Sequence, residues 1–229
     1  MKSYFIKEGY KCNLDSHGKP IPFLDDECGA STYQVKVYEF VKKVILKYDA
    51  TSILDIGCGY GIKLKESILP VCKNIVGIDM KHAIDFCREE HSFGRWFQDD
   101  IERPGLDLLE RFDVVICSDV IEHLCDPDSL LNYIKRYSHG DTHVIISTPA
   151  RDQLRTHGGL GPPVNKTHVR EWTRAEFSAY MSNRDFTILK HFLVGEAGQN
   201  LYEIVRKIVL MEPLRKIQVV HCKQGKDSD

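Results

Sequence analysis

Residues 53–64, ILDIGCGYGIKL, constrain the fold of this chain more than any other segment. The segment opens with an apolar run that predicts a buried strand. Asp55 follows, and glycines then occupy alternate positions, at Gly57, Gly59 and Gly61. Glycines this close together interrupt regular structure and let the backbone lie against a ligand, because no Cβ blocks the approach. The residues after them are expected to start a helix whose first N–H groups point at that ligand.

A second acid follows the glycines at a distance that suits a nucleotide. Residues 74–79, NIVGID, predict another strand, which ends at Asp79. A carboxylate about 20 residues after a glycine turn can accept hydrogen bonds from ribose hydroxyls. The glycine spacing is G-x-G-x-G, whereas a dinucleotide site shows G-x-G-x-x-G, and the P-loop motif does not occur. The pattern therefore favours a cofactor site over an ordinary glycine-rich turn.

Predicted strands alternate with predicted helices along the chain. Strands are expected at 52–56, 74–79, 94–98, 112–118, 142–148, 186–194 and 216–222. Helices are expected at 33–48, 62–70, 81–90, 127–137, 172–181 and 200–210, the fifth with Thr173 as N-cap and Glu176 completing a capping box. This alternation predicts an α/β fold with a Rossmann-like doubly wound sheet that is mostly parallel. Ligands of such sheets bind beyond the carboxyl ends of the strands.

The chain divides into one domain and flanking segments. Residues 1–32 are interpreted as an N-terminal arm or lid, residues 33–222 as the domain, and residues 223–229 as a disordered tail. Residues 149–171 are rich in Gly and Pro and too long for an ordinary connection, so they predict a substrate loop. His157 in this loop is a candidate for contact with the substrate, although a loop histidine is more often only solvated.

Charge and cysteine content limit the partners and the compartment. The chain has 31 basic and 33 acidic residues, and a formal net charge of −2 does not favour extended nucleic-acid binding. No signal peptide is recognised, and no apolar stretch reaches the ~18 residues of a membrane span. The cysteines form no C-x-x-C pair, so they are expected to be reduced core residues of a cytoplasmic protein. They are Cys12, Cys28, Cys58, Cys72, Cys87, Cys117, Cys125 and Cys222.

Four motifs together resemble the class I S-adenosylmethionine (SAM) methyltransferases. They are DIGCGYG at 55–61, GID at 77–79, QDDI at 98–101 and FDVVICSDVIEHL at 112–124, and the resemblance extends over about residues 33–195. It implies that the last two strands form an antiparallel hairpin. It also implies a set of SAM-binding residues, which comprises Asp55, Gly57, Cys58, Gly59, Gly61, Asp79, Met80, Asp99, Asp100, Ile101 and Ser118.

The candidate catalytic residues follow the strand at 112–118. Asp119, Glu122 and His123 would share one helical face if a helix began near Asp119. His123 is then a candidate general base. Alternatively, these three residues and His168 are candidate ligands of Mg²⁺, Mn²⁺ or Zn²⁺. A structural alternative has Glu122 capping a loop or pairing with Arg170, with His123 packed beside the cofactor.

Further aromatic and polar residues are candidates for the cofactor pocket. Tyr33 and Gln34 precede the first predicted helix and could close over the methionine end of SAM, although a simple helix start is an equal alternative. Trp96 and Phe97 could stack on the adenine ring, although packing in the core is the expected role.

The resemblance implies an active SAM-dependent methyltransferase that acts on a hydroxyl of a small metabolite or sugar. The sequence looks most like the small ubiquinone-pathway O-methyltransferases and methyltransferases found with glycan-building enzymes. Small-RNA 3′-terminal 2′-O-methyltransferases carry a similar E-x-x-E-H motif and a later histidine, and Asp119 stands here for their first Glu. A metal-dependent RNA enzyme is therefore one alternative. A SAM-binding partner protein without turnover is another, although a scaffold has no need of the intact motifs.

Overall fold

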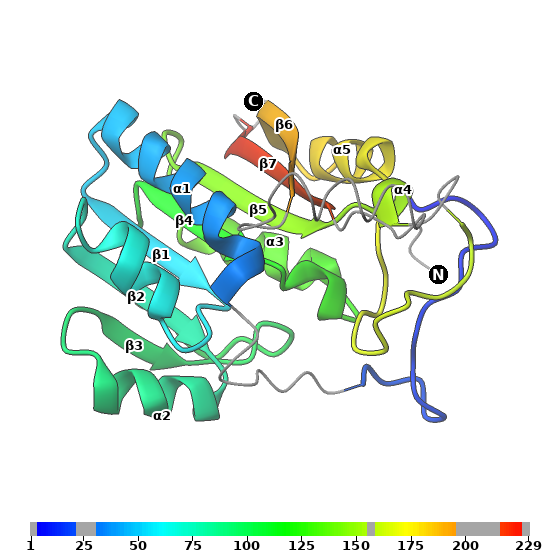
Figure 1. Cartoon of the computed structure of the whole chain (residues 1–229), viewed down its shortest axis with the longest axis horizontal. Helices are drawn as coiled ribbons and strands as arrows, with labels where there is room; N and C mark the ends of the chain where they lie inside the picture. Colours follow the sequence, from blue (N-terminus) through cyan, green and yellow to red (C-terminus); the bar gives the residue numbers. More distant parts are fainter. Residues whose placement is uncertain (1–3, 22–30, 155–158, 196–215, 226–229) are drawn as a thin grey trace, which may run out of the picture.

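A twisted sheet forms the centre of the molecule, with helices on both of its faces (Figure 1). The computed structural model describes residues 4–21, 31–154, 159–195 and 216–225. Within these ranges the sheet has seven strands in the order β3-β2-β1-β4-β5-β7-β6. The strands are β1 (Ser52–Ile56), β2 (Asn74–Asp79), β3 (Arg95–Gln98), β4 (Val114–Ser118), β5 (His143–Pro149), β6 (Phe186–Gly195) and β7 (Lys216–Gln224).

Strand directions confirm the predicted Rossmann-like fold. β1 pairs in parallel with β2 on one side and with β4 on the other, so the strand order reverses direction at this point. β3 and β5 extend the parallel part of the sheet. β7 runs antiparallel to both β5 and β6, as the resemblance implied for the last two strands. The reversal between β1 and β4 is the switch point at which open α/β sheets bind their ligands.

Alternating apolar residues of the strands produce two separate cores. Ile53 and Val114 face α1 (Ser31–Tyr48), the short helix η1 (Leu64–Ile68) and α2 (Lys81–Glu90). Leu54 and Val115 face α3 (Pro127–Arg136) and α5 (Arg174–Ser182) on the opposite side. This period of two, with both sets fully buried, is what a strand covered by helices on both faces requires. Within the described residues, none of the helices combines the length and apolar character needed to cross a bilayer.

The predicted element boundaries agree with the structure to within one or two residues, with three exceptions. The expected helix at 62–70 contains a π-helical turn, in which the Leu69 N–H donates to the Leu64 carbonyl over 2.8 Å. Leu64 and Ile68, four residues apart, lie on the same face of this helix, and both are buried. The helix expected from Asp119 is a short 3₁₀ turn, η2 (Ile121–His123). The expected helix at 200–210 lies outside the described residues.

Residues 4–21 pack against the segment that was predicted to be a substrate loop. The Lys11 N–H donates to the Leu160 carbonyl over 2.9 Å, and the Asn13 N–H donates to the Val169 carbonyl over 3.0 Å. The Trp172 indole N–H donates to the Tyr4 carbonyl over 3.0 Å. These contacts join segments about 150 residues apart in sequence, so the ordered arm and the loop form one unit beside the sheet.

The described cysteines are all free thiols, and most lie in the core as expected. Two differ from the prediction: Cys12 is exposed in the arm, and Cys125 is half-buried after η2. Neither belongs to an apolar element, so neither is drawn into the core. Cys28 lies outside the described residues.

The helix α5 begins at the predicted capping box. The Thr173 side chain accepts a hydrogen bond from the Glu176 N–H, and the Glu176 carboxylate accepts one from the Thr173 N–H over 2.8 Å. Glu176 also forms an ion pair of 2.7 Å with Arg151, which belongs to the one-turn helix α4 (Arg151–Leu154). Glu176 therefore joins the cap of α5 to α4, near the start of the segment that was predicted to be a substrate loop.

Trp96 occupies the core between β2 and α2, which confirms that packing is its role. Its indole N–H donates to the His91 carbonyl over 2.9 Å. The ring lies against Gly77, where an added Cβ would be 2.5 Å from one ring atom of Trp96 and 2.8 Å from the Cys58 sulfur. The tight contact explains why a glycine stands in the middle of β2.

We expect Gly77→Ala to destabilise the fold by about 2 kcal/mol, because the added methyl group overpacks a rigid region of the core. Urea unfolding of the variant measures this effect. Gly140→Ala is the matched control, since no atom lies within 4 Å of an added Cβ there. Equal stability of the two variants would contradict the assigned packing.

Candidate active site

The glycine turn after β1 lies at the switch point of the sheet. Gly57, Gly59 and Gly61 have φ values of 80°, 53° and 69°, in the left-handed region that favours glycine. At Gly57 an added Cβ would also lie 2.2 Å from a methyl carbon of Val120. Cys58, between the first two, is buried. The sequence pattern therefore predicted the turn correctly, and Gly57 and Gly59 are partly exposed at the carboxyl end of β1.

Asp79 closes this turn by binding its backbone. The carboxylate accepts hydrogen bonds from the Gly59 N–H over 2.7 Å and from the Met80 N–H over 2.6 Å. Both bonds fix the carboxylate at the carboxyl end of β2, beside the glycine turn. Met80 itself is half-exposed at the start of α2. The arrangement agrees with the expected position of a ribose-binding acid.

Asp55 is fully buried at the end of β1. The Tyr38 hydroxyl donates to one carboxylate oxygen over 2.6 Å. The other oxygen has no hydrogen-bond partner among the described residues. Burial raises the pKa of Asp55 to about 7, although the Tyr38 hydrogen bond acts to lower it. An unpaired buried carboxylate oxygen beside a ligand turn is a ready acceptor for a polar or cationic ligand group.

The loop after β3 gives different surroundings to Asp99 and Asp100, which the resemblance placed among the SAM-binding residues. The Asp99 carboxylate accepts hydrogen bonds from the Tyr133 hydroxyl over 2.6 Å and from the N–H groups of Gly105 and Leu106. These bonds give Asp99 a role in shaping the loop. Asp100 is exposed, and its carboxylate accepts a hydrogen bond from the Glu102 N–H over 3.0 Å. Asp100 and the half-buried Ile101 next to it are therefore the better candidates for contact with a base.

Asp119 lies in a tight turn and not in the helix that the sequence predicted. Its φ is 57°, and its two carboxylate oxygens accept hydrogen bonds from Gln34 over 3.1 Å and from Ser147 over 2.9 Å. Ser147 also bonds the Ser118 hydroxyl over 2.8 Å. These tertiary contacts stabilise the left-handed conformation and override the helical spacing. Burial raises the pKa of Asp119.

Glu122 is a fully buried carboxylate. The Thr148 hydroxyl donates to one of its oxygens over 2.9 Å, and the other oxygen has no hydrogen-bond partner in the part of the chain that the structure describes. Burial raises the pKa of Glu122 well above its usual value, and the charge of Asp119 adds to the increase. Arg170 does not pair with Glu122, because its guanidinium donates to the carbonyls of Leu124 and Cys125.

The structure brings His123 and His168 together, with ring centroids 4.9 Å apart. His123 Nδ1 lies 3.0 Å from the Thr167 carbonyl, which assigns the proton of the neutral ring to Nδ1. His168 is oriented by Glu171 at 2.9 Å and by the Asn165 amide at 3.0 Å. Burial, together with nearby His168, lowers the pKa of His123 to about 4. His123 is therefore neutral at pH 7.

The ligand atoms of Glu122, His123 and His168 lie within 4.8 Å of one another. One carboxylate and two imidazoles form an N/O donor set that suits a divalent ion such as Mn²⁺ or Zn²⁺. The unpartnered oxygen of Glu122 and the carboxylate that orients His168 fit this interpretation, since metal-bound histidines are usually held by such partners. Asp119, predicted as a fourth ligand, does not belong to the converging set.

Four polar residues around the acids and histidines were not singled out from the sequence: Tyr38, Ser147, Thr148 and Asn165. Ser147 and Thr148 end β5, which pairs in parallel with β4. Polar residues at the ends of neighbouring parallel strands meet at one edge of the sheet, so this signal was present in the sequence.

Of the other candidates, Gln34 contacts Asp119, whereas His157 and the side chain of Tyr33 lie outside the described residues.

Comparisons with known proteins agree on one family. A family model described as a methyltransferase domain matches residues 31–191. The ubiquinone biosynthesis O-methyltransferase of Proteus mirabilis is 34% identical over 107 residues, which cover 44% of this chain and 43% of that protein. The chain thus matches less than half the length of this curated relative.

Solved structures share the fold at low identity. An S-adenosylmethionine-dependent methyltransferase from Clostridium acetobutylicum superposes with a TM-score of 0.61 and 14% identity, covering 86% of this chain and 94% of that one. The plantazolicin methyltransferase BpumL, solved in complex with SAH, superposes with a TM-score of 0.56 and 16% identity, covering 83% of each chain.

We expect Glu122→Gln to stabilise the metal-free protein by about 1 kcal/mol at pH 8, because an ionised carboxylate no longer has to be buried. The folded-state pKa of Glu122 lies above its unfolded value. Between these two pKa values the native state holds a proton that the unfolded state has lost, so the stability of the wild type falls as pH rises from the lower value to the higher one. Thermal unfolding with EDTA at pH 5 and pH 8 measures the difference. An equal effect of the substitution at both pH values would contradict the raised pKa.

Proposed function

We propose that this chain, which belongs to the methyltransferase domain family and is a class I SAM-dependent methyltransferase, transfers the methyl group to a hydroxyl of a small metabolite or sugar. The family match extends over residues 31–191 and so includes the glycine turn, the ribose acid and the polar cluster after β4. Membership of this family agrees with the predicted enzyme and cofactor. A binding protein without turnover is the less favoured alternative.

The cofactor residues proposed here lie at the carboxyl ends of β1, β2, β3 and β4. SAM, when bound, supplies a methyl group already activated by a positively charged sulfur. We assign binding of the ribose hydroxyls of SAM to Asp79, and binding of its methionine end to the glycine turn and Asp55. Its adenine ring is assigned to Asp100 and Ile101. Desolvation raises the pKa of Asp55 and of Asp119, so a cation bound at this edge would favour the ionised form of both carboxyl groups.

The observation that carries the proposed acceptor chemistry is the convergence of Glu122, His123 and His168 at the same edge. Transfer from a sulfonium requires the enzyme to orient the acceptor and to remove its proton. A hydroxyl acceptor needs this help more than a thiol does, because its proton is held more tightly. The ubiquinone-pathway relative is named as an O-methyltransferase, which supports a hydroxyl acceptor.

The low pKa of His123 bears on how the proton is removed. A base with a pKa of about 4 is neutral at pH 7 but a poor proton acceptor, since general bases work best with a pKa near the working pH. A neutral imidazole is, however, the form that binds a metal. A divalent ion held by Glu122, His123 and His168 would supply a Lewis acid that makes a bound hydroxyl more acidic.

We expect wild-type protein to transfer isotope from methyl-labelled SAM to a catechol or sugar within a panel of hydroxylated acceptors. Asp79→Ala should weaken SAM binding by roughly 1.5–3 kcal/mol, because charge-assisted hydrogen bonds are lost. Calorimetry measures SAM affinity, and mass spectrometry identifies the methylated atom. Asp85→Ala is the control, because Asp85 forms an exposed ion pair with Lys81 on α2. Methylation found only on nitrogen or carbon would contradict the proposal.

A metal-dependent RNA 3′-terminal 2′-O-methyltransferase is the second candidate, favoured by the cluster of Glu122, His123 and His168. We expect EDTA to lower kcat at least ~10-fold and Mn²⁺ or Mg²⁺ to restore it, and His168→Ala to abolish the restoration. Titration calorimetry with Mn²⁺ in the absence of acceptor gives an independent measure of the ion. Activity that resists EDTA would instead select His123 as base.

A pair of RNA oligonucleotides separates the two acceptor classes. One carries a 3′-terminal 2′-hydroxyl and the other a 3′-terminal 2′-deoxynucleotide. Methyl transfer to the first and not the second would favour the RNA candidate. Transfer to neither, with turnover of a small hydroxylated acceptor, would favour the first proposal.

A further inference from the structure

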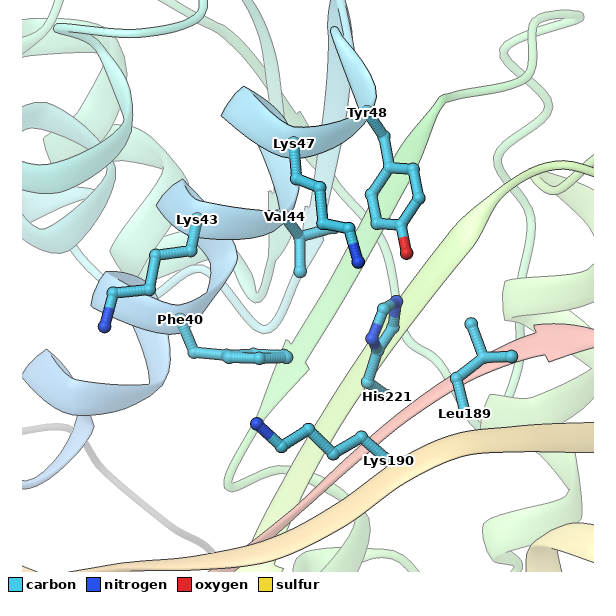
Figure 2. Close-up of a pocket in the computed structure, with 8 residues that line it drawn as sticks. All are labelled: Phe40, Lys43, Val44, Lys47, Tyr48, Leu189, Lys190 and His221. Atoms are coloured by element: carbon cyan, nitrogen blue, oxygen red, sulfur yellow. The ribbon is translucent and has the colours of Figure 1, made fainter.

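A pocket of about 290 Å³ lies between α1, β6 and β7 (Figure 2). Its lining comprises Phe40, Lys43, Val44, Lys47, Tyr48, Leu189, Lys190 and His221. This volume is near the lower limit of small-molecule sites, which begin at about 300 Å³. The pocket is therefore large enough for a ring system of modest size.

The pocket is separate from the candidate active site. Tyr38 contacts Asp55 at the cofactor edge, whereas Tyr48 is the last residue of the same helix and precedes the start of β1. Ten residues of α-helix span about 15 Å along the axis. His143, which stacks on Tyr48, is the first residue of β5. The pocket thus lies toward the amino ends of the strands, opposite the edge that holds the cofactor residues.

Aromatic rings form the walls of the pocket. The Tyr48 ring stacks on His143 with centroids 3.9 Å apart, and Phe40 meets Phe192 edge-on at 4.7 Å. Phe40 also meets His221 edge-on at 5.6 Å. Rings arranged in this way present both faces and edges to a flat ligand.

A β-bulge places an apolar side chain at the rim. Ile188 pairs with Cys222 and Lys190 pairs with His221, so Leu189 is the extra residue between them. Bulges commonly redirect one side chain beside a functional site. Leu189 is 47% exposed and Tyr48 is 43% exposed, which leaves two large apolar groups in contact with water at the pocket.

The lining carries three lysines and no carboxylate. Figure 2 shows the Lys47 ammonium directed toward the space between Phe40 and His221, and the Lys190 side chain extending toward the Phe40 ring. The Lys190 ammonium lies 5.5 Å from the Phe40 centroid, and the Lys47 ammonium lies 4.9 Å from the Tyr48 centroid. The nearby Lys223 pairs with Asp141 at 3.3 Å, so it contributes little net charge. The local excess of positive charge selects an anion.

His221 supplies a polar group at the base of the pocket without adding charge. Its Nε2 lies 2.8 Å from His143 Nδ1, so one imidazole donates and the other accepts. Burial lowers the pKa of both rings. At His221 the charges of His143 and of the neighbouring lysines lower the pKa further. The positive charge of the pocket therefore comes from the lysines.

We propose that this pocket binds a small planar ring carrying an anionic group such as a phosphate, sulfonate or carboxylate. The ring lies against Phe40, Tyr48 and Leu189, and the anion meets Lys47 and Lys190. The proposal does not rest on the methyl-transfer chemistry, because the pocket shares no lining residue with the candidate active site.

The test is a titration of the full chain, carrying ¹³C-methyl-labelled leucine, with 1-naphthyl phosphate. The Leu189 methyl signals, assigned by their loss in Leu189→Ile, report the pocket directly. We expect them to shift and saturate, and the affinity to fall about tenfold in the double variant Lys47→Gln/Lys190→Gln, because both charge-assisted contacts are removed. The matched control is Lys42→Gln/Lys65→Gln, which removes the same charge from lysines outside the lining.

Two further ligands, 1-naphthol and inorganic phosphate, test the ring and the charge separately, and both are expected to bind at least about tenfold more weakly. Equal binding of naphthol, equal binding of phosphate, equal weakening in the control variant or no saturation in the wild type would each overturn the proposal. An unchanged thermal shift with SAM in both double variants shows that they remain folded, whatever the outcome at the pocket.

Discussion

Burial of carboxylates at one edge of the sheet is the constraint on which the candidate active site depends. Asp55, Asp119 and Glu122 lie at the ends of β1 and β4 or just beyond, where Asp55 and Glu122 are fully buried and Asp119 is partly buried. Burial raises the pKa of each, which means that each ionised form is destabilised there. Hydroxyl and amide donors relieve part of this penalty but leave one oxygen of Asp55 and one of Glu122 without a partner among the described residues. Such a site is stabilised further by any cation that enters it, and a sulfonium and a divalent ion are both cations.

Most of the fold was predictable from the sequence because it follows from local patterns. Apolar runs predicted the strands, and the segments between them predicted α1, α2 and α3. The capping box at Thr173 and Glu176 was predicted because all its atoms come from four consecutive residues. The glycine turn after β1 was predicted because glycine adopts positive φ angles most readily, and the sequence shows glycine at those positions. In each case the deciding interactions lie within a few residues.

Features that depend on distant contacts were not predictable. The spacing of Asp119, Glu122 and His123 fits a helical face, but Gln34 and Ser147 hold Asp119 in a left-handed turn. Gln34 lies 85 residues away in the sequence, so no local pattern contains this bond. The sequence likewise gave no reason to separate Asp99 from Asp100. The Tyr133 hydroxyl, 34 residues away, engages Asp99 in the structure.

The arm at residues 4–21 shows how such distant contacts reach the active site. The buried Asn13 amide donates to the carbonyls of Pro163 and Asn165, and Asn165 in turn contacts His168. The Tyr10 hydroxyl accepts a hydrogen bond from the Glu171 N–H, and the Glu171 carboxylate orients the same histidine. Both partners of the His168 ring are therefore held by the arm. Because an imidazole must point accurately to serve as base or ligand, residues 4–21 contribute to the architecture of the candidate site.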